Sequence, residues 1–303
     1  MTFLQAIVIG ALQGVTELFP VSSLGHAVLV PHWIGGSWAQ VVGDESTGES
    51  PYLAFIVVLH VATAAALLVF FWREWVSIVR GLCRSIVRRR IETVHERMAW
   101  LLIIATIPAG ITGLLLEHEL RVVFAKPLAA AIFLTVNGFI LLSGERLRRR
   151  NVAAVAAAEA ERDASGEERS GDELDAAVTT QVRPIDAGWI GLAQVLALFA
   201  GISRSGVTMV AGLLRGLDHE EAVRFAFLLA TPIILAAGLL KVPDFTGPLG
   251  DGIRGQALAG AVAAFIGALI STKFLTRYFQ SNKLTPFGIY CLIFGVASIV
   301  RFG

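Results

Sequence analysis

The chain lacks the charge that a water-soluble domain of its size carries. Only 16% of its 303 residues are Asp, Glu, Lys or Arg, and 55% are hydrophobic. Soluble domains contain about 25% charged residues on average. The mean hydropathy is +0.69. These values exclude an ordinary soluble enzyme and indicate an integral membrane protein.

Basic residues are missing from the start of the chain, where the first Lys or Arg is Arg73. The apolar N-terminal segment therefore lacks the basic region of a secretory signal peptide, and we expect it to remain in the mature protein. Where basic residues do occur they cluster in loops, which leaves no basic face for nucleic acid. The two cysteines, Cys83 and Cys291, suggest neither a disulfide framework nor a cysteine-ligated metal.

Six apolar runs are long enough to cross a hydrocarbon core of about 30 Å as helices. They cover residues 52–72, 98–116, 127–143, 222–240, 255–272 and 285–300. Two further apolar stretches, residues 3–30 and 187–214, are interrupted by glycines and polar clusters, and we interpret them as re-entrant or broken helices. Such backbone is tolerated at membrane depth only when it is buried in protein or lines a water-filled cavity. The expected fold class is an all-α integral membrane protein with about six transmembrane helices and two re-entrant segments.

The distribution of arginines predicts the orientation of the chain. Residues 73–97 contain seven Arg against three Glu, and the sequence ERLRRR follows at residues 145–150. Both stretches lie on one face if the two intervening spans form a hairpin, and the positive-inside bias places that face in the cytoplasm. We interpret residues 72–90 as an anchor to lipid headgroups. Residues 151–183 are interpreted as a solvated, partly helical linker without a catalytic role.

A short internal repeat connects the two broken segments. Residues 12–25 read LQGVTELFPVSSLG and residues 193–206 read AQVLALFAGISRSG. The alignment pairs Gln13 with Gln194, Ser22 with Ser203 and Gly25 with Gly206. Inverted repeats with broken helices place the binding site where the two broken elements meet. We therefore expect two inverted membrane repeats, and divide the chain into a first repeat (1–144), a charged cytoplasmic loop (145–186) and a second repeat (187–303).

The predicted site combines polar groups from both copies. The first copy supplies Gln13, Glu17, Ser22, Ser23 and His26, and the second supplies Gln194, Ser203, Arg204, Ser205 and Thr208. Ionisable residues inside a membrane are costly and indicate function, and Glu17 and Arg204 are the natural pair. A guanidinium flanked by hydroxyls and backbone amides is a common way to hold phosphate oxygens. A phosphate site is therefore favoured over a purely structural ion pair.

Histidine placement is less specific. His26 follows the two serines by one short turn, so we expect it to face Glu17 and to act as a general acid or a nucleophile. For His60 and Thr63, in the middle of the next span, hydrogen bonding within the helix packing is the favoured interpretation. Lining the site is the alternative for both residues.

Two stretches of the sequence resemble the signatures of a known family. The stretch LQGVTELFPVSSLGH, residues 12–26, resembles the first signature of the bacitracin-resistance type of undecaprenyl-diphosphate phosphatase. The stretch AGISRSGVT, residues 200–208, resembles the second signature, and EAVRFAFLLATP resembles the sequence that follows it in that family. The likeness extends over nearly the whole chain.

The resemblance implies a multi-pass enzyme of the bacterial cytoplasmic (inner) membrane whose site opens toward the outer face. Its expected reaction is hydrolysis of undecaprenyl diphosphate to undecaprenyl phosphate and inorganic phosphate, which recycles the lipid carrier of peptidoglycan synthesis. Bacitracin is expected to compete by sequestering this polyprenyl diphosphate, and a homodimer is left open. By matching position, the implied functional residues are Gln13, Glu17, Ser22, Ser23, His26, Ser203, Arg204, Ser205 and Thr208.

The mechanism is left open among several routes. Within the resemblance, Glu17, His26, Arg204 and Ser23 are the expected catalytic residues, and Gln13, Ser22, Ser203, Ser205 and Thr208 join Arg204 around the phosphate. The implied cofactor is a divalent cation, Mg²⁺ or Ca²⁺, with Glu17 as its candidate ligand. The attacking group is His26, Ser23 or water. A secondary transporter or lipid flippase is the strongest alternative, and a non-catalytic scaffold is weaker.

Three departures from the family pattern are visible. Gln13 stands where many members have Glu, which makes a site with two carboxylates less expected here. Ala200 replaces the usual Pro, which loosens a turn without removing a functional group. The charged insert between residues 151 and 183 is longer than is typical.

Overall fold

The computed structural model describes residues 1–43, 50–124, 126–151, 169–247 and 250–303, and no strand occurs among them. The helices of the N-terminal half are α1 (Phe3–Thr16), α2 (Ser23–Ile34), α3 (Ser37–Val42), α4 (Pro51–Phe70), α5 (Trp72–Arg88), α6 (Val94–Phe124) and α7 (Pro127–Asn151). The helices that follow are α9 (Gly171–Gln181), α10 (Pro184–Val195), α11 (Arg204–Leu214), α12 (His219–Thr246), α13 (Arg254–Ser281) and α14 (Thr285–Phe302), with the 3-10 turn η2 (Leu196–Leu198) after α10.

Six of these helices are long and apolar enough to cross a membrane, which confirms the six spans expected from the sequence. They are Pro51–Phe70, Val94–Leu116, Pro127–Arg148, His219–Lys241, Arg254–Ser281 and Thr285–Phe302. Their outer faces carry large apolar side chains that no protein covers, among them Val300, which is 81% exposed, and Leu239, which is 73% exposed. Lipid is the solvent that suits such surfaces. The expected fold class, an all-α integral membrane protein, is confirmed.

The two broken segments also form as expected. Between α1 and α2 the chain leaves the helix at Glu17, and Pro20 prevents a regular helix from continuing. Between η2 and α11 the chain turns at Gly201, whose φ of +114° is natural only for glycine. Each turn thus sits between two short helices, and each is followed by a long span.

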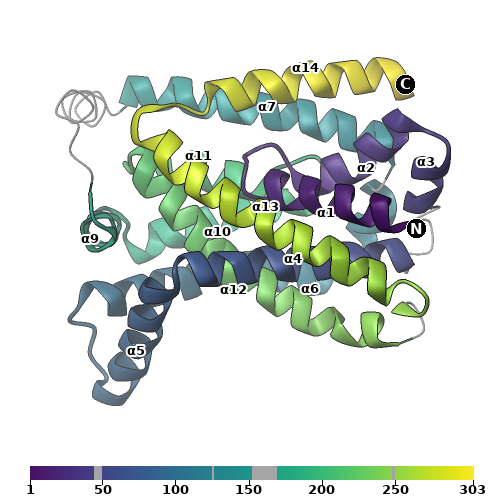
Figure 1. Cartoon of the computed structure of the whole chain (residues 1–303). Coiled ribbons are helices and arrows are strands. Elements are labelled where there is room, and N and C mark those ends of the chain that lie inside the picture. Colours follow the sequence, from purple (N-terminus) through teal and green to yellow (C-terminus); the bar gives the residue numbers. More distant parts are fainter. Residues whose placement is uncertain (44–49, 125, 152–168, 248–249) are drawn as a thin grey trace.

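The packing of the two halves is reciprocal. The first short helix of each half packs on a long span of the other, α1 against α13 and α10 against α6, and the pairs α4 with α12 and α7 with α14 join corresponding spans. In Figure 1, α7 and α14 lie along one side of the bundle and α4 and α12 along the other, with the short helices between them. The turns at Pro20 and Gly201 are therefore buried inside the bundle, whereas the short helices before them keep exposed apolar faces.

The boundaries of the predicted cytoplasmic loop differ from the helix ends. α7 continues beyond residue 144 to Asn151, α9 lies within the loop, and α10 already begins at Pro184. The helix α9 packs against α6 and α12, and residues 152–168 of the predicted linker lie outside the described residues. The division into repeats and loop stays a prediction.

Candidate functional site

Two short turns from opposite halves of the chain meet at the centre of the bundle. At the first, the hydroxyl oxygen of Ser22 accepts hydrogen bonds from the amides of Gly25 and Gly201, each at 3.2 Å. At the second, the hydroxyl oxygen of Ser203 accepts one from the amide of Gly206, also at 3.2 Å. Both serines are N-cap residues. Because the Gly201 amide bonds Ser22, the turns from which α2 and α11 begin lie side by side.

Close approach of the two turns requires glycine at both contact positions. A Cβ on Gly25 would come within 2.9 Å of the Gly201 Cα, and a Cβ on Gly201 within 2.4 Å of the Ala130 carbonyl oxygen. Real Cβ atoms do not approach other atoms so closely, so a side chain at Gly25 would push the two turns apart, and one at Gly201 would push the second turn away from α7. Two helix N-termini, with their unpaired first amides and positive dipole ends, consequently converge on one location that suits an anion.

A buried asparagine of α7 fastens both turns to each other. The Asn137 amide nitrogen donates to the Pro20 carbonyl at 3.0 Å, and its carbonyl oxygen accepts from the Ser203 amide at 3.0 Å. The side chain is fully buried. Sequence reasoning missed this residue, although a lone amide in the middle of an apolar span was a visible signal.

Glu17 lies at the centre of the cluster, and donors surround it. Its Oε1 accepts a hydrogen bond from Arg204, which confirms the expected pair, and its Oε2 accepts from the Ser23 hydroxyl. The Gln13 amide nitrogen donates to the same Oε2 at 3.0 Å, a contact that residues four apart on a helix can make. The Nε2 of His60 lies 3.2 Å from this oxygen. One carboxylate from the first half therefore orients a hydroxyl, an amide, an imidazole and a guanidinium.

His60 is the residue that sequence reasoning placed in the helix packing. Its Nδ1 does bond within α4, to the Ile56 carbonyl at 2.8 Å, but its Nε2 reaches Glu17. A carbonyl and a carboxylate are both acceptors. Both ring nitrogens of His60 therefore face acceptors, and the ring links α4 to the carboxylate of the first turn.

The expectation that His26 faces Glu17 is wrong. The His26 Nδ1 lies 2.7 Å from the Ser22 carbonyl oxygen, and Nε2 lies 2.7 Å from the Tyr290 hydroxyl. Because a carbonyl can only accept, Nδ1 donates, and Nε2 of the neutral ring accepts from the tyrosine. The ring also stacks on Tyr290, with 5.6 Å between the ring centroids. His26 therefore points toward α14, away from the carboxylate.

The remaining predicted residues divide into two groups. The Ser203 and Ser205 hydroxyls lie 3.0 Å apart, beside Arg204 on the first turn of α11, and Thr208 is buried one turn further on. Gln194, the counterpart of Gln13, is not part of the cluster, since its amide nitrogen donates to the Ala105 carbonyl of α6 at 2.9 Å. The structure thus brings Gln13, Ser23 and Arg204 to Glu17 and places Ser22, Ser203 and Ser205 in the adjoining turns, whereas Gln194 lies apart and the buried His26 contacts Tyr290.

The cluster is accessible where Arg204 and His60 lie. Gln13, Glu17 and Ser23 are buried, whereas the Arg204 side chain is 18% exposed and that of His60 is 26% exposed. A guanidinium has five N–H donors, and the contact with Glu17 uses those of one nitrogen. Arg204 therefore keeps donors for an anion that approaches from this side.

The oxygens available to a divalent cation are few. The Gln13 Oε1 is buried and has no hydrogen-bond partner, and it belongs to the side chain that contacts Glu17. Among the described residues, no group of three or more His, Cys, Asp and Glu is arranged to hold a metal. A divalent cation bound here would take most of its ligands from phosphate oxygens and water, which is how Mg²⁺ is usually held.

Comparison with known proteins gives a consistent result. A family model described as "Bacitracin resistance protein BacA" matches residues 6–297. A protein of Mycolicibacterium paratuberculosis named undecaprenyl-diphosphatase is 58% identical over 99% of this chain and 97% of its own length. Proteins named undecaprenyl-diphosphatase 2 from Frankia alni and Chromobacterium violaceum are 54% and 42% identical, with at least 98% of each sequence covered.

Proposed function

This chain belongs to the bacitracin resistance protein BacA family, and we propose that its membrane-embedded site hydrolyses undecaprenyl diphosphate to undecaprenyl phosphate and inorganic phosphate. The observation that carries the assignment to this site is the hydrogen bond from the Ser23 hydroxyl to the Glu17 carboxylate, beside Arg204. A hydroxyl held on a carboxylate next to a phosphate-binding guanidinium is the arrangement of an activated nucleophile. The transporter alternative gives no reason for it.

Of the three attacking groups that the sequence leaves open, the geometry favours Ser23. In the proposed first step, Ser23 Oγ forms a bond to the terminal phosphorus, and its proton passes to Glu17. The bond from that phosphorus to the bridging oxygen breaks, and undecaprenyl phosphate leaves with the bond's electrons. Water then attacks the phosphoserine, which releases inorganic phosphate and returns the proton to Ser23.

Arg204 and the two helix N-termini supply the electrostatic part. Phosphoryl transfer depends mainly on positioning and on stabilisation of charge on the phosphate oxygens. We propose that the free donors of Arg204 and the first amides of α2 and α11 bind the terminal phosphate, with Ser205 and Thr208 beside it. Ser22 and Ser203, whose hydroxyls cap the helices, act as positioning residues. A divalent cation held by Gln13 and Glu17 would neutralise further charge on the diphosphate.

His26 and His60 have different proposed roles. Attack by His26 would require its Nε2 to leave the Tyr290 hydroxyl, so we propose that it positions the first turn of α2 through the Ser22 carbonyl. The direct role that the sequence predicted for it remains a prediction. His60, in contact with Glu17, is proposed to offset the negative charge of this carboxylate and to exchange a proton with it.

The localisation proposed is the bacterial inner membrane with the site open toward the outer face. Six apolar spans support a multi-pass membrane protein, and the arginine-rich ends of the hairpin formed by α6 and α7 support the orientation. Bacitracin then acts on the same reaction by sequestering the diphosphate substrate.

The test is phosphate release by the purified full-length protein from a long-chain prenyl diphosphate in detergent, with and without EDTA. We expect turnover by the wild type, loss in EDTA with recovery on adding Mg²⁺ or Ca²⁺, and loss in Ser23→Ala. Ser85→Ala, which removes a buried serine far from the site, is the matched control and should retain activity. Rapid quenching with substrate labelled in the terminal phosphate should trap label on Ser23. No phosphate from the wild type would favour a carrier, and turnover without any label on the protein would favour water as the nucleophile.

A further inference from the structure

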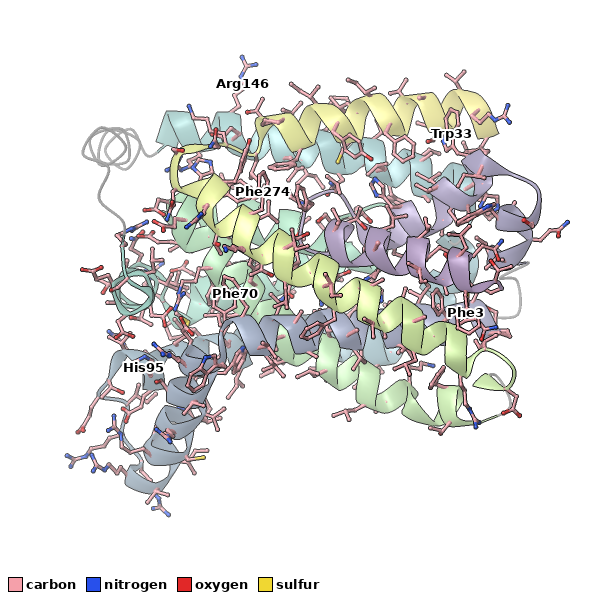
Figure 2. The ribbon with its side chains drawn as sticks, in the orientation of Figure 1. Phe3, Trp33, Phe70, His95, Arg146 and Phe274 are labelled. Carbon is pink, nitrogen blue, oxygen red and sulfur yellow. The ribbon has the colours of Figure 1, made fainter. Side chains whose placement is uncertain are left out.

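The helix α5 leaves the bundle where a membrane span ends. Phe71 ends α4 and is also the N-cap of α5, so no linker separates the two helices. In Figure 1, α5 runs steeply across the direction of α4 and away from the bundle, and in Figure 2 Phe70 and His95 mark where the chain enters and leaves this arm. A helix in this position begins at the membrane surface and runs along it.

One face of α5 packs on the protein. Ile78, Gly81 and Ser85 lie against α6, where a Cβ on Gly81 would come within 3.0 Å of the Glu96 amide and where the Trp100 indole donates to the Ser85 hydroxyl at 3.0 Å. The arm is therefore fixed to the base of α6.

A second face of α5 is apolar and uncovered. With about 100° between successive residues, a single stripe holds Trp72, Val76, Val79, Cys83, Ile86 and Val87. All of these residues are exposed, and the exposed fraction reaches 82% at Val87. An uncovered stripe of this kind, beside the end of a membrane span, is unfavourable in water.

The third face is cationic and borders the apolar stripe. Residues 72–90 contain six arginines against one acidic residue, Glu74. Among the described residues, Arg84 pairs with Glu96, while no ion pair involves Arg73, Arg80 or Arg88. Arg73 and Arg80 border the stripe, and Arg88 is exposed further round the helix, toward the face that packs on α6.

We propose that α5 is an interfacial helix that inserts its apolar stripe among the acyl chains of the cytoplasmic leaflet and binds anionic phospholipid headgroups through Arg73, Arg80 and Arg88. Apolar and arginine-rich faces side by side, in the plane of the membrane, are the features of helices that bind anionic bilayer surfaces. The bilayer phospholipid is the occupant because the arm starts at a membrane span and its charge complements acidic headgroups. The reaction of the catalytic site does not depend on this surface.

The test uses Cys83 as a reporter, since Cys291 is fully buried. The full-length protein is labelled at Cys83 with a fluorophore, placed in nanodiscs at one copy per disc, and quenched with brominated phosphatidylglycerol or brominated phosphatidylcholine. We expect quenching by both lipids, with at least a threefold preference for phosphatidylglycerol that falls as salt is added. The triple variant Arg73→Gln, Arg80→Gln, Arg88→Gln should lose that preference and keep phosphatase activity, which also shows that it folds.

The matched control removes the same charge from the same end of the bundle. Lys273→Gln, Arg277→Gln, Lys283→Gln alters exposed residues outside α5 and should leave the preference unchanged. Absence of quenching in single-copy discs would overturn the proposal, and crosslinking of Cys83 between two copies would then identify a second chain as the occupant. A preference that survives the α5 triple variant, or that falls equally in the control, would also overturn it.

Discussion

The two turns that meet in the bundle have the same construction and different chemistry. In each, a serine caps a short helix by accepting the amide of a glycine three residues later, at Ser22 with Gly25 and at Ser203 with Gly206. The residues that follow the caps are Ser23 in one turn and Arg204 in the other, at equivalent positions of the repeat. One position therefore supplies the proposed nucleophile, and its counterpart supplies the guanidinium proposed to bind the phosphate.

The turns also differ in how their backbone is held. In the first, Ser22 itself has a positive φ of 70°, which is unusual for a residue with a side chain, and its hydroxyl accepts two amides. In the second, Gly201 takes the positive φ and Ser203 accepts one amide. The Ser22 hydroxyl thus both caps its own helix and joins the two turns, next to the carboxylate and the proposed nucleophile, and positioning a reacting atom requires such fixed contacts.

Removing the proposed nucleophile should cause the largest loss of activity. Ser23→Ala is expected to lower kcat by at least about 10⁴-fold, because the remaining groups can only bind and polarise the phosphate. The measurement is steady-state phosphate release. Ser205→Ala, a neighbouring serine of the other turn, should reduce kcat far less. Equal losses in the two variants would contradict the division of roles.

Substitution of Arg204 should cause the next largest loss of activity. Arg204→Lys keeps the charge and loses the planar fork, and we expect kcat/KM to fall by about 10²-fold. Arg215→Lys is the matched control, since Arg215 is paired with Asp186 outside the site. If Arg204→Lys stayed within a few-fold of wild type, the guanidinium would be only a structural partner of Glu17.

The effect of His60→Gln should be smaller, about 10-fold on kcat, because glutamine can still donate to Glu17 and cannot exchange a proton. A purely structural histidine would leave the pH–rate profile unchanged, so a changed profile is the decisive readout. His32→Gln is the control. Its Nδ1 bonds the carbonyl four residues earlier in the same manner as that of His60, at 2.7 Å to Val28. Identical profiles for wild type and His60→Gln would remove His60 from the proposed mechanism.

The smallest expected difference concerns the caps. Ser203→Ala should lower the free energy of unfolding by about 1 kcal/mol, the usual cost of losing an N-cap. Ser22→Ala leaves two buried amides without an acceptor, and should cost about 2 kcal/mol. Thermal unfolding in one detergent compares the two directly. A Ser203→Ala variant less stable than Ser22→Ala would contradict the larger contribution expected of the Ser22 hydroxyl.

Much of this architecture could be predicted from the sequence, for identifiable reasons. Apolar length alone defines the six spans, because backbone in lipid must satisfy its own hydrogen bonds. The pair Glu17 and Arg204 followed from the short repeat together with the cost of leaving either charge alone in a membrane. The contact between Gln13 and Glu17 followed from helical periodicity, which needs no tertiary information.

The contacts that could not be predicted depend on how separate helices rotate against each other. His60 reaches Glu17 because of the way α4 packs beside the first turn, and its position in a span fixes no such neighbour. His26 turns away because its partner, Tyr290, is on the last helix. In both cases hydropathy defines the helix, whereas packing decides which direction its polar side chain points.

The bond between Asn137 and the two turns also has a consequence for the order of synthesis. Glu17 and Pro20 are synthesised long before Ser203 and Arg204. When the first turn enters the membrane, the Glu17 carboxylate therefore lacks its guanidinium partner and the Pro20 carbonyl lacks its amide donor. The Asn137 side chain can bind Pro20 as soon as α7 is inserted, and its own oxygen then remains available for the Ser203 amide. The asparagine can thus keep the Pro20 carbonyl in its final position while the second half of the protein is being translated.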